Sequence, residues 1–180
     1  MTRSVRKTRS GFTLVECIAT MVVLTTIGSV ASMIAMTATD SYLGSRAAAQ
    51  INSELHVAIS RLHHEISRIE LDTSAGANIK SVTSSSMTWR DSANATYSVT
   101  WSGDTLQLVI KGGTARTLLK DVTSFSVQAF DQDNSPMAAS LSGTACRVIR
   151  RVAVSATVER NGVAETLGTK IFITATRQTP

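Results

Sequence analysis

Hydrophobic residues dominate the N-terminal part of the chain. An apolar run starts at Phe12 and continues to Thr39, and from Cys17 onward this run contains no charged residue. About 20 apolar residues are enough for a helix to cross the ~30 Å hydrocarbon core of a bilayer. We therefore predict a membrane-spanning helix over residues 12–39.

The hydrophobic pattern changes between residues 40 and 72. Apolar side chains now recur at alternating spacings of four and three residues, with charged residues between them, and the members are Ile51, Leu55, Ile59, Leu62, Ile66 and Ile69. Such spacing places them on one face of a helix. No proline interrupts residues 12–71, so the apolar helix is expected to continue into an amphipathic extension over residues 40–72.

A third pattern, with a period of two, characterises residues 73–180. Apolar and polar residues alternate in segments 97–101, 106–110, 125–129, 152–158 and 171–175, with turn sequences between them. Asn161-Gly162 is a strong signal for a two-residue hairpin. These patterns predict short antiparallel strands with one buried face. A single sheet covering the apolar face of the amphipathic helix would give an α+β fold.

Two segments of this region lack the alternation. Residues 73–85 are small and polar, and we expect a loop with at most one short strand. Residues 142–146 are also expected to form a loop. Trp89 and Trp101 are interpreted as core or sheet-face residues.

Positive charge is concentrated at the start of the chain. The 180 residues carry a formal net charge of +5, and residues 1–10 contain four basic side chains and no acidic one: Arg3, Arg6, Lys7 and Arg9. Removing these four charges would lower the net charge to +1, which argues against a nucleic-acid binder. Basic residues beside an apolar helix favour a cytoplasmic N-terminus, with the rest of the chain on the other side of the membrane.

One carboxylate interrupts the apolar run. Glu16 is its fifth residue, and an unpaired carboxylate in a bilayer costs a few kcal/mol. We therefore expect Glu16 to have a partner.

The first 40 residues resemble the type IV prepilin signature. A short basic leader ends in Gly11, the sequence Phe12-Thr13-Leu14-Val15-Glu16 follows, and the apolar run comes next. The family comprises type IV pilins and the pseudopilins of type II secretion. The resemblance implies a filament subunit, and the absence of a disulfide loop favours a minor pilin or minor pseudopilin.

The resemblance also implies roles for individual residues. Residues 1–11 would be a cytoplasmic leader peptide, which prepilin peptidase, a membrane aspartyl protease, would remove after Gly11. Phe12 would become the N-terminus and be N-methylated. Glu16 would pair with the Phe12 ammonium of a neighbouring subunit, since two opposite charges buried together attract strongly. The chain would reside in the bacterial inner membrane, with residues 73–180 as its extracytoplasmic globular domain, and then enter a pilus or pseudopilus.

Two other interpretations of the N-terminus stay open. A secretory signal peptide could be cleaved near Val30-Ala31-Ser32. An unprocessed signal anchor could instead hold an extracytoplasmic binding module on the membrane. Both alternatives leave Glu16 without a role.

The sequence offers no catalytic constellation, and we expect no enzymatic activity. It contains no nucleophile elbow and no glycine-rich phosphate loop. His56 and His63 lie about 10 Å apart along a helix axis, too far for one metal ion. Cys17 belongs to the apolar helix and Cys146 to the soluble part, so a disulfide between them is not expected.

Two polar clusters remain. Residues 131–136 are expected to form a polar turn, although oxygen-bearing side chains at Asp131, Asp133 and Ser135 leave calcium as a weak candidate. No other cofactor is expected. The second cluster consists of Arg147, Arg150 and Arg151, for which a solvated edge is favoured over an acidic partner surface.

Overall fold

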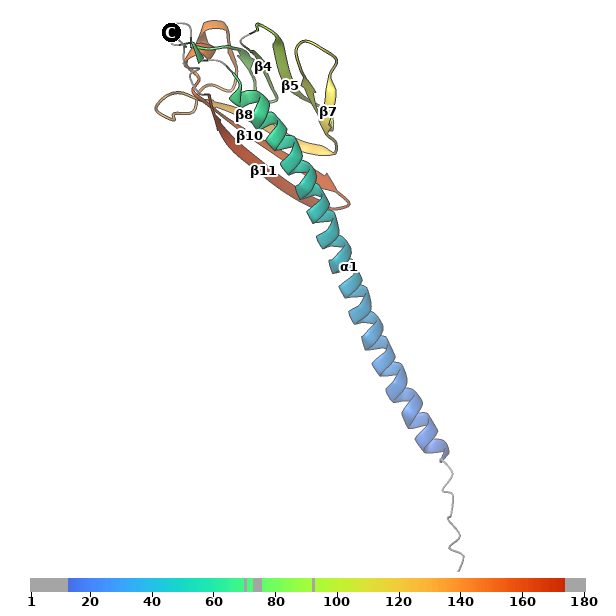
Figure 1. Ribbon diagram of the computed structural model, residues 1–180. Helices are drawn as coiled ribbons and strands as arrows, with labels where there is room; N and C mark the ends of the chain where they lie inside the picture. The colour runs from blue at the N-terminus through green and yellow to red at the C-terminus, as the bar shows by residue number, and fades with distance from the viewer. Residues whose placement is uncertain (1–12, 70, 73–75, 92, 174–180) are drawn as a thin grey trace, which may run out of the picture. The chain divides into compact units, whose positions relative to one another are not determined.

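The computed structural model describes residues 13–69, 71–72, 76–91 and 93–173. The chain divides into two units, residues 1–45 and 46–180, which are considered separately below. A long helix, α1 (Leu14–Ser67), contributes to both units (Figure 1). The α+β fold expected from the sequence is confirmed, with the second half of α1 packed on antiparallel sheet.

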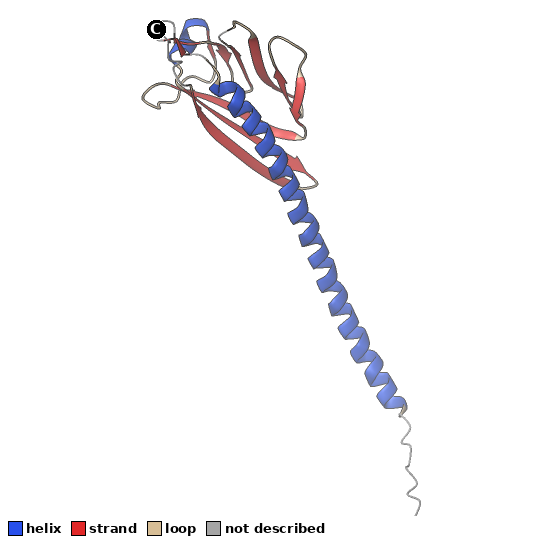
Figure 2. Ribbon diagram, viewed as in Figure 1, coloured by secondary structure: helices blue, strands red, loops and turns tan. Residues whose placement is uncertain are grey.

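The helix begins and ends close to the predicted limits. In the first unit, the described residues consist of Thr13 and the helix up to Ser45 (Figure 2). In the second unit, α1 ends at Ser67, short of the expected limit at residue 72, because Leu71–Asp72 already form a short strand, β1.

The described residues of the second unit form, besides the second half of α1, eleven strands and one short helix. The strands are β1 (Leu71–Asp72), β2 (Gly76–Ala77), β3 (Ile79–Val82), β4 (Ser86–Arg90), β5 (Thr96–Ser102), β6 (Thr105–Val109), β7 (Arg116–Leu119), β8 (Val122–Phe130), β9 (Leu141–Ser142), β10 (Arg151–Arg160) and β11 (Val163–Phe172). A 3₁₀ helix, Gly143–Val148, precedes β10.

The strands form separate antiparallel sheets rather than the single sheet expected. One sheet has the order β11-β10-β8, a larger one has the order β7-β6-β5-β4-β3-β9, and β1 pairs with β2. Alternation of apolar residues specifies which face of a strand is buried, but it does not specify which strands share a sheet.

Most of the predicted strands are confirmed, and three predictions need correction. The alternations at 97–101, 106–110, 125–129 and 152–158 fall on β5, β6, β8 and β10. The segment predicted at 171–175 begins inside a longer strand, β11, which ends at Phe172. Ile173 follows this strand and is buried. Ala175 lies outside the described residues.

The other two corrections concern segments expected to be loops. Residues 142–146 belong to β9 and the 3₁₀ helix, whose buried Cys146 anchors it in the core. Residues 73–85 contain β2 as well as β3.

The core of the second unit lies between α1 and the two larger sheets. All six apolar residues of the predicted helical stripe are buried, with exposed fractions of 5% or less. They join the buried faces of both sheets in one hydrophobic cluster, which includes Trp89 from β4 and Val154 from β10. The Trp89 ring stacks on Tyr97, with 5.8 Å between ring centroids. The amphipathic half of the helix is therefore part of the globular fold.

Candidate functional site at the start of the helix

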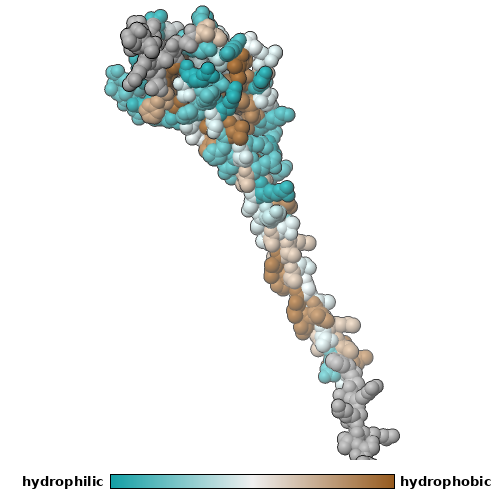
Figure 3. All heavy atoms as spheres, viewed as in Figure 1, coloured by the Kyte–Doolittle hydropathy of each residue, from teal (hydrophilic) through white to brown (hydrophobic). Residues whose placement is uncertain are grey.

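The first half of α1 presents an apolar surface with no covering element among the described residues. Every side chain from Thr13 to Leu43 is exposed. The mean hydropathy of its most apolar 18-residue window is 2.0, and brown, hydrophobic residues dominate this segment in Figure 3. Soluble monomers rarely expose contiguous apolar surface of this extent. By length and composition, this helix could span a membrane.

The serine and threonine hydroxyls between Thr20 and Thr39 donate to carbonyl oxygens within the helix itself. Thr25 Oγ1 donates to the carbonyl oxygen of Met21 at 3.0 Å, and Ser32 Oγ donates to that of Gly28 at 2.9 Å. The same pattern applies to Thr20, Thr26, Ser29, Thr37 and Thr39. Because lipid offers no hydrogen-bond partners, such internal bonding suits a helix surrounded by hydrocarbon.

Glu16 and Thr13 form a reciprocal cap at the N-terminus of α1. The backbone N–H of Glu16 donates to Thr13 Oγ1 at 3.3 Å. In return, the Glu16 carboxylate accepts the backbone N–H and the hydroxyl of Thr13, each at 3.0 Å from Oε2. This arrangement is a capping box, in which a threonine and a glutamate three residues later satisfy helix N–H groups that lack an intrahelical acceptor. The negative charge also lies at the favourable end of the helix dipole.

The capping box gives Glu16 a partner within its own chain. The threonine-to-glutamate spacing is visible in the sequence as a capping signal, whereas the resemblance indicated only a partner in another subunit. Gly11 and Phe12, the predicted cleavage and methylation residues, lie outside the described residues. The pairing of Glu16 with Phe12 therefore stays a prediction.

The loop considered for calcium forms a polar turn, as expected. Asp131 Oδ1 accepts the backbone N–H groups of Asp133 at 2.9 Å and Ser135 at 2.8 Å. Asn134 of this loop also has a partner: its Oδ1 accepts a hydrogen bond from Lys170 Nζ of β11 at 3.0 Å. Among the described residues, no group of three His, Cys, Asp or Glu side chains could hold a metal ion.

The two cysteines differ in their surroundings. Both are free: Cys17 is exposed on the first half of α1, whereas Cys146 is buried in the second unit. Burial raises the pKa of the Cys146 thiol. A buried thiol with a raised pKa reacts slowly, and here it packs as a small hydrophobic residue of the core.

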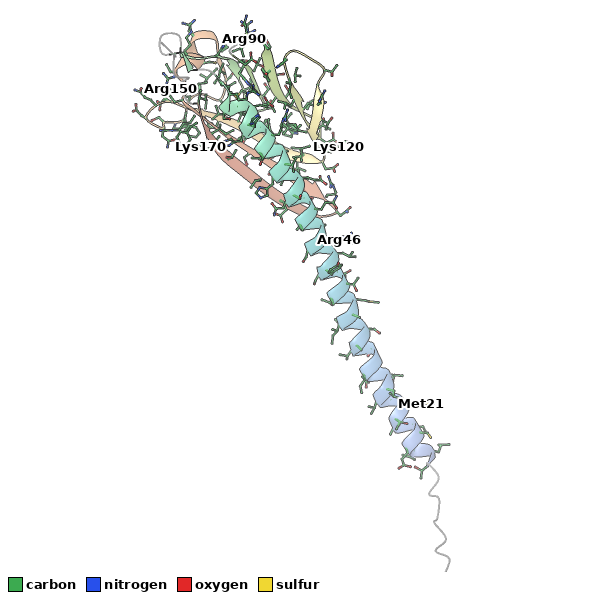
Figure 4. The ribbon with its side chains drawn as sticks, viewed as in Figure 1. Met21, Arg46, Arg90, Lys120, Arg150 and Lys170 are labelled. Carbon is green, nitrogen blue, oxygen red and sulfur yellow. The ribbon has the colours of Figure 1, made fainter. Side chains whose placement is uncertain are left out.

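The predicted arginine cluster makes local contacts. Arg150 donates to the carbonyl oxygens of Arg147 and Ile149 at 2.8 and 3.1 Å (Figure 4). The Arg151 guanidinium lies 5.0 Å from the centroid of the Phe172 ring. Arg147 is exposed, whereas Arg150 and Arg151 are half-buried. The preference for a solvated edge over an acidic partner surface stays a prediction.

A three-residue ion network in the second unit was not foreseen. Arg160, at the end of β10, contacts both carboxylate oxygens of Glu54 on α1 at 3.2 Å, and its Nε donates to Asp121 Oδ2 at 2.9 Å. These hydrogen bonds raise the pKa of Arg160, and the bond to Arg160 is the main reason that the pKa of Glu54 is lowered. Glu54 and Arg160 are 106 positions apart, so no local pattern indicates their contact.

No model of a known protein family matches the chain, and a search of curated proteins found no match.

Proposed function

We propose that this chain is a subunit of a type IV pilus or of a type II secretion pseudopilus, most simply a minor one. Its role is assembly rather than catalysis. The observation that carries the proposal is an exposed helix whose apolar run, up to Thr39, contains a single carboxylate, Glu16, in the first turn. The resemblance of residues 1–40 to the prepilin signature supplies the family.

In the proposed pathway, the chain first enters the inner membrane with its basic N-terminus in the cytoplasm. Prepilin peptidase removes residues 1–11 and the new N-terminus at Phe12 is methylated. The mature helix then leaves the bilayer to pack among other pilin or pseudopilin helices, while the residues from Arg46 onward form the extracytoplasmic domain.

Cleavage after Gly11 changes the electrostatics around Glu16. It creates an ammonium group at Phe12, four residues before the carboxylate. In a packed apolar bundle, each charge alone is costly to bury, whereas the pair is stabilised by strong attraction. We propose that Glu16 accepts this ammonium from a neighbouring subunit, in addition to capping its own helix through Thr13.

The second candidate function is a membrane-anchored binding module with an unprocessed anchor. The exposed apolar helix is compatible with it. In a binding module of this kind, capping its own helix would be the only role of Glu16. The two candidate functions therefore differ in whether Glu16 also pairs with a neighbouring subunit.

Substitutions at the cap distinguish the roles of Glu16. Glu16→Gln keeps a side chain that can complete a capping box but removes the charge, whereas Thr13→Ala weakens the cap and keeps the charge. In the native host, we expect Glu16→Gln to enter the membrane normally and to be lost from sheared filaments. The Thr13→Ala variant should be present both in the membrane and in the sheared filaments.

The opposite pattern would contradict the filament proposal. If Glu16→Gln assembles like the natural chain while Thr13→Ala fails to accumulate, Glu16 acts only as a helix cap.

A further inference from the structure

The strand β11 has an open edge. In the described part of the chain, its sole strand neighbour is β10, with ten consecutive residue pairs and no bulge. Exposed edges of this length are normally blunted by prolines, bulges or charges, because their free N–H and C=O groups recruit further strands. β11 contains no proline.

The hairpin turn determines which backbone groups point away from β10. Asn161 and Gly162 have φ values of 54° and 76°, as in a type I′ two-residue turn, which makes Arg160 and Val163 a hydrogen-bonded pair. Residues at odd positions of β11 therefore bond to β10. Those at even positions direct their N–H and C=O groups outward, and they are Ala164, Thr166, Gly168, Lys170 and Phe172.

The open edge borders a groove beside the second half of α1. This groove has a volume of about 340 Å³ and is lined by three β11 residues, Leu167, Gly168 and Thr169, and by His56, Ile59, Ser60 and His63 of the helix. Ile59 is nearly buried, at 5% exposed, whereas the two histidines and Ser60 are exposed. The groove thus combines a largely buried apolar residue with exposed polar residues and a row of free backbone groups.

The outer face of β11 carries positive charge next to this groove. Lys170 Nζ lies 3.9 Å from the centroid of the Phe130 ring (Figure 4), and the neighbouring Arg151 contacts Phe172. Neither cation forms a salt bridge with another described residue. Lys170 is the charged residue among the even positions of β11. Its side chain lies on the outer face of the sheet, so it does not cover the free backbone groups at the edge.

We propose that this groove binds an extended segment of a partner protein, which adds to β11 as a fourth strand of the sheet. Cross-strand neighbours share a face of the sheet, so the partner residues opposite Leu167 and Thr169 face the groove beside Ile59 and are apolar. The partner residue opposite Lys170 lies on the outer face and is acidic. The positive charge of Lys170 and Arg151 favours such an acidic segment over a second copy of β11, which would bring another lysine.

A designed peptide tests this proposal with the full chain in detergent micelles. The probe is the heptapeptide Thr-Val-Asp-Val-Thr-Val-Thr-amide with fluorescein on its N-terminal amine, whose valines share one face and whose aspartate lies on the other. We expect saturable binding by fluorescence anisotropy, measured against empty micelles. The same peptide with alternate N-methylated amides should lose binding, since it cannot complete the ladder.

Thr166 provides a matched pair of variants at the edge. Thr166→Pro removes one outward N–H and leaves every backbone hydrogen bond to β10 in place, and we expect a loss of affinity of about tenfold. Thr166→Ala keeps this N–H and, like the proline variant, loses the hydroxyl that lies 2.9 Å from Thr157 Oγ1, so its affinity should stay within about twofold.

Two further variants test the groove and the charge. Ser60→Trp fills the groove and should block binding, whereas Ser53→Trp, on the same helix but outside the groove, should not. Lys170→Glu should weaken binding of the aspartate probe and favour a probe with lysine at that position.

Several outcomes would overturn the proposal. They are the absence of saturable binding, equal binding of the N-methylated peptide, or natural affinity in both Thr166→Pro and Ser60→Trp. If the chain instead forms dimers that Thr166→Pro and Ser60→Trp disrupt, the occupant is a second copy and the partner proposal is wrong.

Discussion

The amphipathic half of α1 allows a quantitative test with a matched control. Leu62 is fully buried between helix and sheet, with 0% of its surface exposed, while Val57 on the same helix is 70% exposed. Truncating each residue to alanine removes apolar atoms from opposite environments. If the second half of α1 is an integral part of the globular fold, the two substitutions should differ greatly in cost.

The expected magnitude follows from the burial of Leu62. Leu62→Ala removes three carbon atoms from the core, which at about 0.8 kcal/mol each gives roughly 2.4 kcal/mol of lost transfer free energy. The cavity left behind adds to this cost, and buried Leu→Ala substitutions generally lie between about 2 and 5 kcal/mol. We therefore expect Leu62→Ala to lower the free energy of unfolding by about 3 kcal/mol. Val57→Ala should change it by less than about 0.5 kcal/mol.

Urea unfolding of the full chain in micelles measures this difference. Trp89 is 1% exposed and stacked on Tyr97, so its fluorescence should shift to the red when the sheets separate from the helix. Equal slopes of unfolding free energy against urea would confirm that the variants expose the same surface. Similar small effects of Leu62→Ala and Val57→Ala would refute the packing described here.

Three other predictions concern the globular domain. In a Cys17→Ser background, Cys146 should react with a maleimide only as fast as the domain opens; rapid labelling in the native state would contradict its burial. Glu54 has a pKa below its ordinary value of 4.5 because it accepts hydrogen bonds from Arg160 and Gln50, so its stabilising contribution is present above this pH and is lost on acidification. Arg160→Met should therefore reduce the loss of stability between about pH 5 and pH 3, by less than about 1 kcal/mol for these partly exposed groups; identical pH profiles would exclude the network as a source of stability. Gly162→Ala should destabilise the domain by about 1 kcal/mol in urea unfolding, because φ at this position is 76°; an unchanged unfolding curve would mean that the turn relaxes freely.

The sequence predicted those parts of the fold that depend on local periodicity. The six apolar residues of the amphipathic helix are all buried, because helical spacing determines which side chains share a face. The same holds for the alternation in β10 and for the turn at Asn161-Gly162. These features need only neighbouring residues and can be read without knowledge of the tertiary structure.

Features that depend on distant residues were not predictable in the same way. The division into two sheets, the open edge of β11 and the contact between Arg160 and Glu54 arise from pairings across many positions. Glu65 is a further example: its spacing suggests the polar face of the helix, yet it is 4% exposed and paired with Arg61 at 3.0 Å. The cap between Thr13 and Glu16 is different, since its signal is local and was present in the sequence.

The central claim is that Gly11-Phe12 is a processing site and that the mature chain assembles through its exposed apolar helix. The most direct test is the intact mass and N-terminal sequence of the protein purified from native membranes. We predict a chain that begins at Phe12 and is heavier by one methyl group than its sequence requires. A chain beginning at Met1 would identify an unprocessed anchor, and a start just after the Val30-Ala31-Ser32 segment would identify an ordinary secretory signal. Either result would contradict the claim.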